Sequence, residues 1–417
     1  MLLTSLLRMG LTRSFQPFRF KNLGPSPLKY KDLDNLGLYV HIPFCRTLCS
    51  FCPYCKVPYD FDTAVRYKKA LLGEIELAGR SMKGKKTVTG LYFGGGTPAL
   101  MAEDLGDIIK KLREYFIITG GIGAELHPED ITPENLHKLK ESGITMVSLG
   151  IQSFDRECLA RLGRQGDDFI HKLGLVKASG FETVDVDLIF AIPGQTEESL
   201  KKDIALAFEH GATQISTYPF IDFTFANNPH KPLSQKKKKH LLKVLSEECR
   251  KHNRVRTSVW TFALPDTRKY SSVTREAFLG FGVSATTLLR DCFKINTFSI
   301  DAYCRRIEQE LLPTSLTLSF TLRQRAVYYL FWSAYGLKLF PERFEAVIGK
   351  PVEKLFGAEL WLLERLGYIR REKSYYEMTE KAATYYHRIE QVYTTAYIDR
   401  MWRISRNTAF PEEIVLR

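Results

Sequence analysis

Between residues 36 and 295, short apolar segments alternate with segments whose apolar residues recur at helical spacing. The expected strands are LGLYVHIP, VTGLYFGGG, GIGAELHP, MVSLGIQSF, TVDVDLIFAIP and QISTYPF, and the stretches after them, such as 63–82 and 103–116, are expected helices. Such alternation predicts parallel strands joined by right-handed crossovers. Six repeats are too few for a closed eight-fold barrel, so we expect an α/β fold built on a partial (β/α)6 barrel.

After residue 295 the alternation stops. The segment TLRQRAVYYLFWSAYG predicts a helix, and LFGAELWLLERLGYIRREKSYYEMTEKAATYYHRIEQVY predicts a helix, a short hairpin and a second helix. That order resembles a small winged-helix unit, which we expect to act as a lid or interaction module rather than to bind DNA. We therefore divide the chain into an N-terminal basic arm (1–35), a core barrel (36–295) and a C-terminal helical, winged-helix-like domain (296–417).

The composition adds limits to this outline. The chain of 417 residues is 44% hydrophobic and 26% charged, as in an ordinary globular protein. No apolar run approaches the roughly 18 residues of a membrane span. The net charge of +13 suits an anionic small molecule, a lipid surface or a nucleic acid, but no nucleic-acid-binding motif accompanies it. The run Lys236–Lys239 is expected to be a solvated helix start.

The N-terminal stretch MLLTSLLRMGLTRSFQPFRFK contains four basic residues, and no acidic residue occurs before Asp32. Three interpretations stay open: an irregular arm packed across the barrel, an organellar transit peptide, and a basic amphipathic segment lying on a membrane. We expect a cytoplasmic protein, with membrane association or organellar targeting as the alternatives.

Four of the eight cysteines lie between Cys45 and Cys55, and the other four are scattered. Clustering of this kind indicates a metal site in a reducing compartment rather than a disulfide framework. The stretch CPYC, Cys52 to Cys55, matches a glutaredoxin dithiol, but that chemistry gains nothing from two further cysteines just before it. Structural zinc usually takes paired Cys-x2-Cys units that lie far apart in sequence.

The spacing Cys45-x3-Cys49-x2-Cys52 favours a 4Fe–4S cluster over both of those sites. Three thiolates on one loop hold three irons and leave the fourth iron without a protein ligand. An open iron can bind an amino group and a carboxylate together. Cys55 is interpreted as a non-ligand close to the cluster.

This cysteine spacing is also that of the radical S-adenosylmethionine (SAM) superfamily, and the chain most closely resembles the anaerobic coproporphyrinogen III oxidase family. The resemblance covers roughly residues 36 to 310. It is carried by six motifs in order: YVHIPFC (Tyr39–Cys45), GGGTP (Gly94–Pro98), ELHP (Glu125–Pro128), SLGIQSFD (Ser148–Asp155), DLIFAIPGQT (Asp187–Thr196) and GFGVSA (Gly280–Ala285).

The resemblance implies a cluster on Cys45, Cys49 and Cys52, with SAM chelated to the open iron. It further implies that Gly94, Gly95, Gly96 and Thr97 approach the methionine part of SAM, because glycines admit close backbone contact. Glu125 is expected at the ammonium or ribose, Arg164 at the carboxylate, and Gln152 and Asp187 at ribose hydroxyls. Gly282 and Ala285 mark an expected second SAM molecule, and Tyr39 is the candidate catalytic residue.

Three reactions fit this family resemblance. We expect C-methylation of a planar, anionic or hydrophobic ring, a menaquinone-like quinone or a tetrapyrrole, with the second SAM as carbon donor. The first alternative is oxidative decarboxylation of coproporphyrinogen III, and the second is a haem-chaperone or cluster-bearing binding role. An external one-electron donor of the flavodoxin or ferredoxin type is expected as a partner, membrane contact through the N-terminus is possible, and nucleic acid is not expected.

Overall fold

The computed structural model of the protein describes residues 8–80, 84–226, 228–267 and 276–416. Its main element is one 14-stranded sheet. The strands of this sheet are β1 (Phe18–Lys21), β2 (Leu36–Ile42), β6 (Leu91–Gly95), β8 (Ile122–Leu126), β9 (Met146–Gln152), β10 (Thr183–Phe190), β11 (Gln214–Pro219), β12 (Val255–Arg256), β13 (Thr261–Ala263), β14 (Ala277–Phe281), β15 (Thr286–Leu288), β16 (Cys292–Asn296), β17 (Thr314–Ser319) and β21 (Glu413–Leu416). Their order across the sheet is β12-β13-β11-β10-β9-β8-β6-β2-β14-β15-β16-β17-β1-β21.

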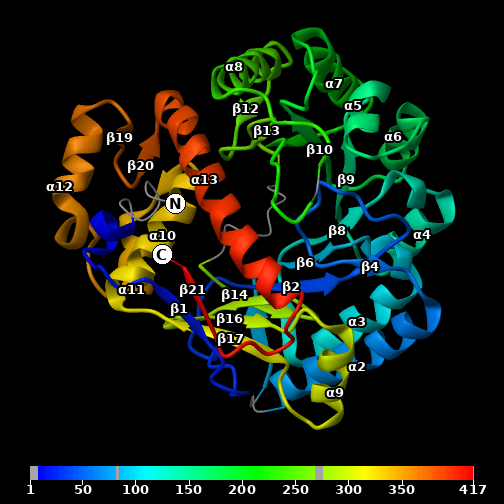
Figure 1. Ribbon diagram of the computed structural model, residues 1–417, viewed down its shortest axis with the longest axis vertical. Coiled ribbons are helices and arrows are strands. Elements are labelled where there is room, and N and C mark those ends of the chain that lie inside the picture. The colour runs from blue at the N-terminus through cyan, green and yellow to red at the C-terminus, as the bar shows by residue number, and fades with distance from the viewer. Residues whose placement is uncertain (1–7, 81–83, 227, 268–275, 417) are drawn as a thin grey trace.

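Six neighbouring strands, from β2 through β6, β8, β9 and β10 to β11, pair in parallel. These are the six strands expected from the sequence, and the sheet stays open, so the partial (β/α)6 barrel is confirmed. Helices cover its outer rim (Figure 1). They are α2 (Phe61–Gly79), α3 (Ala102–Tyr115), α4 (Pro133–Glu141), α5 (Arg156–Arg161), α6 (Phe169–Ala178), α7 (Glu197–Glu209) and α8 (Gln235–Lys251).

Local sequence explains where these elements begin and end. The Thr132 hydroxyl accepts from the Asn135 N–H at 3.1 Å and caps α4, as expected from the sequence. Gly143 follows that helix with a φ of +88°, a backbone conformation that favours glycine. The expected end of the helix at 63–82 lies partly outside the described residues, because α2 is described only to Gly79 and residues 81–83 are not described.

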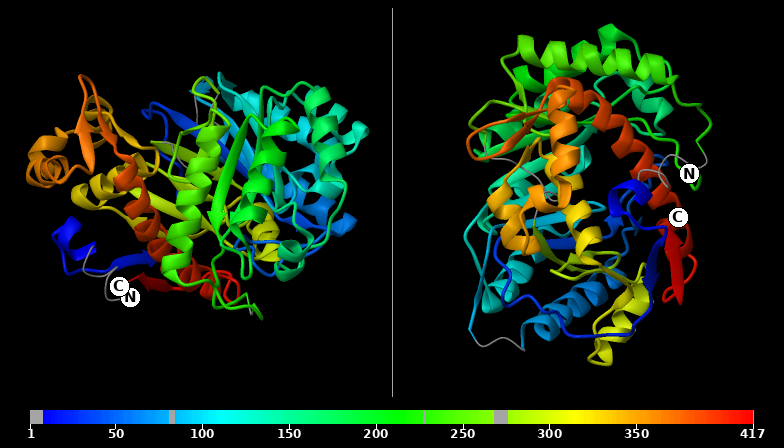
Figure 2. Two further views of the ribbon diagram at one scale, coloured as in Figure 1. Left: turned by 90° about the horizontal axis from the view of Figure 1, so that it is seen from above. Right: turned by 90° about the vertical axis from the view of Figure 1, so that its left-hand side faces the viewer.

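Beyond the barrel strands the sheet continues without a break. β14 pairs in parallel with β2, and β14 to β17 then form an antiparallel series. The expected division between residues 295 and 296 falls inside β16, so the sheet crosses it. Near the two ends of the chain, β1 pairs with β21, so residues 18–21 and 413–416 lie side by side (Figures 1 and 2). Residues 8–35 of the expected arm thus contribute a strand, and residues 1–7 lie outside the described residues.

A separate C-terminal unit has its own small core. It contains α10 (Leu322–Tyr335), α11 (Pro341–Ile348), α12 (Val352–Arg365) and a three-stranded sheet of β18 (Lys338–Leu339), β20 (Tyr376–Met378) and β19 (Ile369–Arg371). Residues including Phe344, Val352 and Phe356 form its apolar centre. The helix, hairpin and helix expected from the sequence are present. The long helix α13 (Glu380–Ser405) then runs diagonally between this unit and the β/α part (Figure 1).

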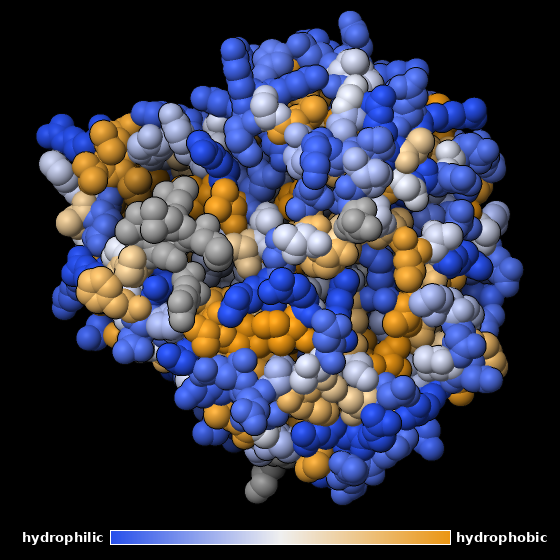
Figure 3. All heavy atoms as spheres, in the orientation of Figure 1, coloured by the Kyte–Doolittle hydropathy of each residue, from blue (hydrophilic) through white to orange (hydrophobic). Residues whose placement is uncertain are grey.

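Among the described residues, no helix combines the length and the apolar character needed to cross a membrane. The face in Figure 3 is hydrophilic at its top, over α7 and α8. Most of the lysine run at the start of α8 is exposed, as expected. Lys238 is the exception: its side chain is buried and its Nζ donates to the Phe220 carbonyl oxygen at 3.0 Å.

Candidate functional site

A cavity of about 670 Å³ joins the barrel to the C-terminal unit. This volume lies within the roughly 300–1,000 Å³ range of small-molecule sites. Its lining comes from the cysteine loop, from the C-terminal ends of the parallel strands, and from α10 and α13. Parallel barrels place working residues at this end of their strands. The cavity is therefore the candidate active site.

Cys45, Cys49 and Cys52 all line this cavity, on the loop that follows β2. The Cys52 N–H lies 3.4 Å from the Cys49 carbonyl oxygen, which closes a tight turn between the second and third thiols. Burial raises the pKa of Cys45 to about 12, with a further contribution from the nearby Cys52. Thiols bind iron as thiolates, so cluster assembly must remove these protons.

The three cysteines meet the requirement of a cluster, because each cluster ligand binds a different iron atom. Three free thiols lie on one loop and line a shared cavity, as this requirement asks. Within the described residues, no group of three or more His, Cys, Asp or Glu side chains is arranged to hold a single ion.

The glycine turn at the end of β6 packs tightly against the first motif. Gly95 has a φ of +118°, and a Cβ there would lie 2.5 Å from the His41 ring. A Cβ on Gly96 would lie 2.5 Å from the Phe44 carbonyl oxygen. The Gly95 N–H donates to Glu125 at 3.0 Å. These contacts explain why only glycine fits, and they bring the turn beside the cysteine loop, where Thr97 donates to the Cys45 sulfur at 3.9 Å.

Arg164 fits the expected carboxylate of SAM. Its side chain is 8% exposed and lines the cavity, and its Nη2 is buried without a hydrogen-bond partner. Burial lowers its pKa, while the nearby Cys49 and Cys52 raise it. A buried guanidinium with an unpaired N–H group favours an anionic ligand, because the ligand would restore the missing hydrogen bonds.

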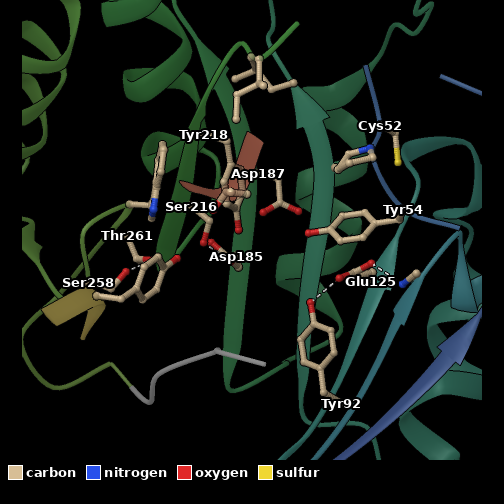
Figure 4. A pocket seen from close by; sticks show the side chains of 18 of the residues that line it. Cys52, Tyr54, Tyr92, Glu125, Asp185, Asp187, Ser216, Tyr218, Ser258 and Thr261 are labelled. Carbon is tan, nitrogen blue, oxygen red and sulfur yellow. Dashed lines mark hydrogen bonds between the residues drawn. The ribbon is translucent and has the colours of Figure 1, made fainter. Parts of the chain in front are cut away.

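The remaining expected SAM contacts also reach the cavity. Glu125 accepts from the Tyr92 hydroxyl at 2.6 Å, and Asp187 accepts from the Ser148 hydroxyl at 2.9 Å. Burial raises the pKa of both carboxyl groups. Gln152 ends β9 with a φ of +73° and lines the cavity. The close-up in Figure 4 shows the Tyr54 ring between the carboxyl groups of Glu125 and Asp187.

Tyr39, the expected catalytic residue, is not among the cavity's lining residues. Its hydroxyl lies 3.0 Å from His41 Nδ1, and its ring stacks on that of Tyr92. His41 Nε2 lies 2.8 Å from the Cys55 carbonyl oxygen, which can only accept, so Nε2 donates and Nδ1 accepts from Tyr39. Burial lowers the pKa of His41 to about 4 and keeps the ring neutral. Tyr39 thus supports the cysteine loop, and its stacking partner Tyr92 lines the cavity.

Gly282 and Ala285, expected at a second SAM, also lie outside the cavity lining. The Gly282 N–H donates to Glu74 at 2.6 Å, and the Gly282 carbonyl oxygen accepts from Asn296 at 3.0 Å. A Cβ at Gly282 would lie 2.3 Å from the Tyr67 hydroxyl. This motif is therefore a buried packing element of the sheet among the described residues, and the structure does not bring it together with the other SAM residues.

Several lining residues were not expected from the sequence. Tyr92 and Asp185 each lie two positions before an expected residue, Gly94 and Asp187, on the same strand and therefore share its side. Strand periodicity was the signal that would have found these two. Gln214, Ser216 and Tyr218 alternate along β11, a strand on which no site residue was expected. Others come from the C-terminal unit and gave no signal, because only packing brings them to the cavity. They include Arg325, Tyr328 and Trp332 of α10 and Glu390 of α13.

Comparison with known proteins agrees with this geometry. Residues 39–207 match the family described as the radical SAM superfamily. The haem chaperone HemW of Bacillus subtilis is 25% identical over 82% of this chain and 95% of its own length. The oxygen-independent coproporphyrinogen III oxidase of Escherichia coli is 29% identical over 66% of each protein. The solved structure of coproporphyrinogen III oxidase (HemN) from Escherichia coli superposes with a TM-score of 0.74 at 22% identity, covering 93% of this chain and 98% of that one.

The chain therefore contains a radical SAM domain, built as a partial barrel with the cysteine loop at its C-terminal face. Its homologues include the haem chaperones HemW and the oxygen-independent coproporphyrinogen III oxidases. A radical SAM domain implies a 4Fe–4S cluster and SAM as cofactors. The expected preference for methylation of a quinone gains no support from these relatives, and the two alternatives fit them better.

Proposed function

We propose that this protein binds a tetrapyrrole beside a SAM-bound 4Fe–4S cluster and carries out radical chemistry on that ring. One observation carries the proposal: a single cavity runs from the three cysteines to the aromatic side chains of α10. When bound, the cluster supplies the electron that cleaves SAM into methionine and a 5′-deoxyadenosyl radical. Relatives named for coproporphyrinogen III and for haem point to a tetrapyrrole rather than a quinone.

In this proposal the barrel residues hold SAM in place. Cys45, Cys49 and Cys52 are the cluster ligands, and Arg164 binds the carboxylate of SAM. Glu125 is already held by Tyr92 and the Gly95 N–H, so its carboxyl group is oriented before SAM arrives. Such preorganisation reduces the entropy lost on binding.

Further along the barrel, the carboxyl groups of Asp185 and Asp187 project from alternate positions of β10 into the same cavity. The Ser216 hydroxyl donates to Asp185 at 2.6 Å, and burial raises the pKa of Asp185 to about 6. We assign Asp187 and Gln152 to the ribose hydroxyls of SAM. Asp185 lies beyond them, where it can accept a hydrogen bond from a pyrrole N–H of the ring substrate.

A second candidate function is that of a haem chaperone. It is favoured by the coverage of the HemW relative from Bacillus subtilis, which extends over 95% of that protein, whereas the oxidase match covers 66%. In that case the cavity would hold haem, and the cluster would take no part in a reaction of the ring. Both candidates share the tetrapyrrole site and differ in the chemistry that follows binding.

The test is anaerobic reconstitution with iron and sulfide, followed by SAM and dithionite, with products resolved by liquid chromatography and mass spectrometry. Formation of 5′-deoxyadenosine and methionine is the expected result, stimulated by a tetrapyrrole. Coproporphyrinogen III that loses carbon dioxide identifies the oxidase reaction. Haem binding without change of the ring identifies the chaperone. S-adenosylhomocysteine together with a heavier ring product would restore methyl transfer, and absence of SAM cleavage would refute the enzyme proposal.

A further inference from the structure

Arg325 on α10 is a buried cation at the end of the cavity that the C-terminal unit lines. Its side chain is 4% exposed and lines the cavity. Its Nη2 donates to the Glu276 carbonyl oxygen at 2.6 Å, and its Nε is buried without a partner. Among the described residues Arg325 forms no ion pair. Burying a guanidinium without a bonded counter-ion costs several kcal/mol, so this arrangement needs a reason.

The acid that interacts electrostatically with Arg325 is Glu276, but its carboxylate hydrogen-bonds other residues. One of its oxygens accepts from Asn35 at 2.8 Å, and it also hydrogen-bonds the Tyr329 hydroxyl. Its negative charge attracts the Arg325 guanidinium and so offsets part of the cost of burying it. It does not satisfy the buried Nε–H group, which a ligand can therefore complete.

The surroundings of Arg325 favour a flat ring. Tyr328, Tyr329 and Trp332 follow it on the same face of α10, at helical spacing, and all of them line the cavity. The Tyr328 ring centroid lies 5.7 Å from the Arg325 guanidinium carbon. Aromatic side chains of this kind pack against planar ligands, and a guanidinium beside them adds charge recognition.

A comparison with Arg164 separates two anion positions. Arg164 comes from the barrel beside Cys49 and Cys52, whereas Arg325 comes from the C-terminal unit. Both are buried, and each has a guanidinium nitrogen without a partner. The proposed function assigns Arg164 to the carboxylate of SAM. Arg325 is then left for an anionic group of the second ligand in the cavity.

We propose that Arg325 anchors a carboxylate of the ring substrate, while Tyr328 and Trp332 pack against the ring itself. The planar guanidinium fork matches a carboxylate and binds it through two parallel hydrogen bonds. This anchor selects rings that bear acidic side chains, such as the propionates of a tetrapyrrole, and disfavours an uncharged quinone. The inference rests on the proposed function, because it names the part of the tetrapyrrole that the C-terminal unit recognises.

The test compares coproporphyrin III with its tetramethyl ester, each titrated in the same detergent into the full chain. Binding is followed by quenching of tryptophan fluorescence, since Trp260 and Trp332 line the cavity. The wild-type protein is expected to prefer the free acid at least 10-fold. Arg325→Gln is expected to weaken binding of the acid by about 10- to 100-fold and to change binding of the ester less than 3-fold.

Two further variants keep the result interpretable. Arg325→Lys retains the charge without the planar fork and is expected to lose an intermediate amount of affinity. Arg371→Gln removes an exposed cation of the same C-terminal unit that does not line the cavity and is the matched control, with a change below 3-fold expected. Thermal unfolding and cluster absorbance report whether each variant is folded. If Arg325→Gln does not fold, the Lys variant and the acid-to-ester ratio of the wild type decide.

The outcomes separate the two proposals. Equal binding of acid and ester by the wild type, or an unchanged affinity in Arg325→Gln, overturns the carboxylate anchor and leaves the tetrapyrrole proposal intact. Failure of the wild type to bind either form overturns the tetrapyrrole proposal and the anchor with it. An uncharged quinone that displaces the free acid from the cavity would also contradict the selectivity that the anchor is proposed to provide.

Discussion

The barrel end and the C-terminal end of the cavity differ in whether their lining residues belong to sequence motifs. At the barrel end, the reactive residues sit in ordered motifs, each at the end of a parallel strand. At the other end, the lining residues come from α10 and α13 and belong to no recognisable motif. In the proposed function, the first end holds the cofactor and the second holds the ring substrate. Motifs therefore indicate the cofactor, and packing indicates the ligand.

Buried charge is only partly satisfied at both ends. Glu125 and Asp187 at the barrel end each accept a hydrogen bond from a neighbouring hydroxyl, and Glu390 of α13 accepts one from the Thr394 hydroxyl at 2.6 Å. Arg164 at the barrel end and Arg325 at the other end each keep a buried guanidinium nitrogen without a partner. Each end therefore offers a charged group that a ligand can complete.

The largest expected effect is at the barrel end. Cys49→Ala removes one of three thiolates, and a cube held by two ligands on a solvent-accessible loop should not persist. We expect loss of nearly all bound iron and of SAM cleavage, measured by iron content, visible absorbance and 5′-deoxyadenosine. Cys55→Ala is the matched control, because Cys55 lies outside the cavity lining, with its sulfur 3.5 Å from the Phe298 carbonyl oxygen. Equal loss of iron in both variants would show that the ligand set is wrong.

The next effect concerns the charge on α13. Burial raises the pKa of Glu390 to about 7, from 4.5 for an exposed glutamate. Between those values the folded state holds a proton that the unfolded state has lost, so stability falls as the pH rises through this window. The loss amounts to up to about 3 kcal/mol.

Glu390→Gln removes this titration. The free energy of unfolding of the variant, relative to that of the wild type, should therefore rise between pH 5 and pH 8, as measured by urea unfolding at both pH values. Other buried acids titrate equally in both proteins and cancel in the difference. Tyr54, Tyr335 and Tyr386 surround the carboxyl group and stay neutral in this range. A constant difference between variant and wild type at the two pH values would contradict the prediction.

A crossed pair of variants sharpens the contrast between the two buried arginines. Arg164→Gln should weaken SAM binding by about 10- to 100-fold and leave coproporphyrin III binding within 3-fold of wild type, because the two anions bind at different ends. Arg325→Gln should show the reverse pattern. Equilibrium dialysis with labelled SAM provides the first affinity, and tryptophan quenching the second. If either variant weakens both ligands alike, the cavity does not have two independent anion positions.

The smallest expected effect separates stability from binding. Thr132→Ala removes the cap of α4 on the outer rim, and Thr321→Ala removes the cap of α10. Each should lower the free energy of unfolding by about 1 kcal/mol. Only Thr321→Ala should also weaken tetrapyrrole binding, since α10 carries Arg325. Similar affinities for both variants would mean that the start of α10 does not position that side chain.

Much of the barrel was predictable because its information is local. Apolar runs of strand length defined all six parallel strands, and a threonine and a glycine marked the ends of α4. Parallel strands bring their ends to one face, so the residues after them could be grouped without coordinates. For that reason Cys45, Glu125, Gln152 and Asp187 were expected together, and the structure places them on one cavity.

Residues chosen from motifs alone were less well placed. Tyr39 and Gly282 belong to motifs as distinctive as GGGTP, yet neither lines the cavity. A motif indicates that a position needs one residue type. Tight packing can impose that need as strictly as contact with a ligand can. At Gly282 the requirement is the 2.3 Å that separates a Cβ position from the Tyr67 hydroxyl, and at Tyr39 it is the hydrogen bond to His41.

The order of amino acids by itself determined the barrel and the cysteine loop, because hydrophobic periodicity and short spacings act over a few residues of chain, and the resemblance of its motifs to a known family implied the cofactors. The tertiary structure alone decided what faces the cofactor across the cavity. Arg325 and Glu390 follow the cysteine loop by hundreds of residues, and no local rule links them to it. They meet because the C-terminal unit packs its own core and α13 runs between it and the barrel, and that packing is a property of the whole chain.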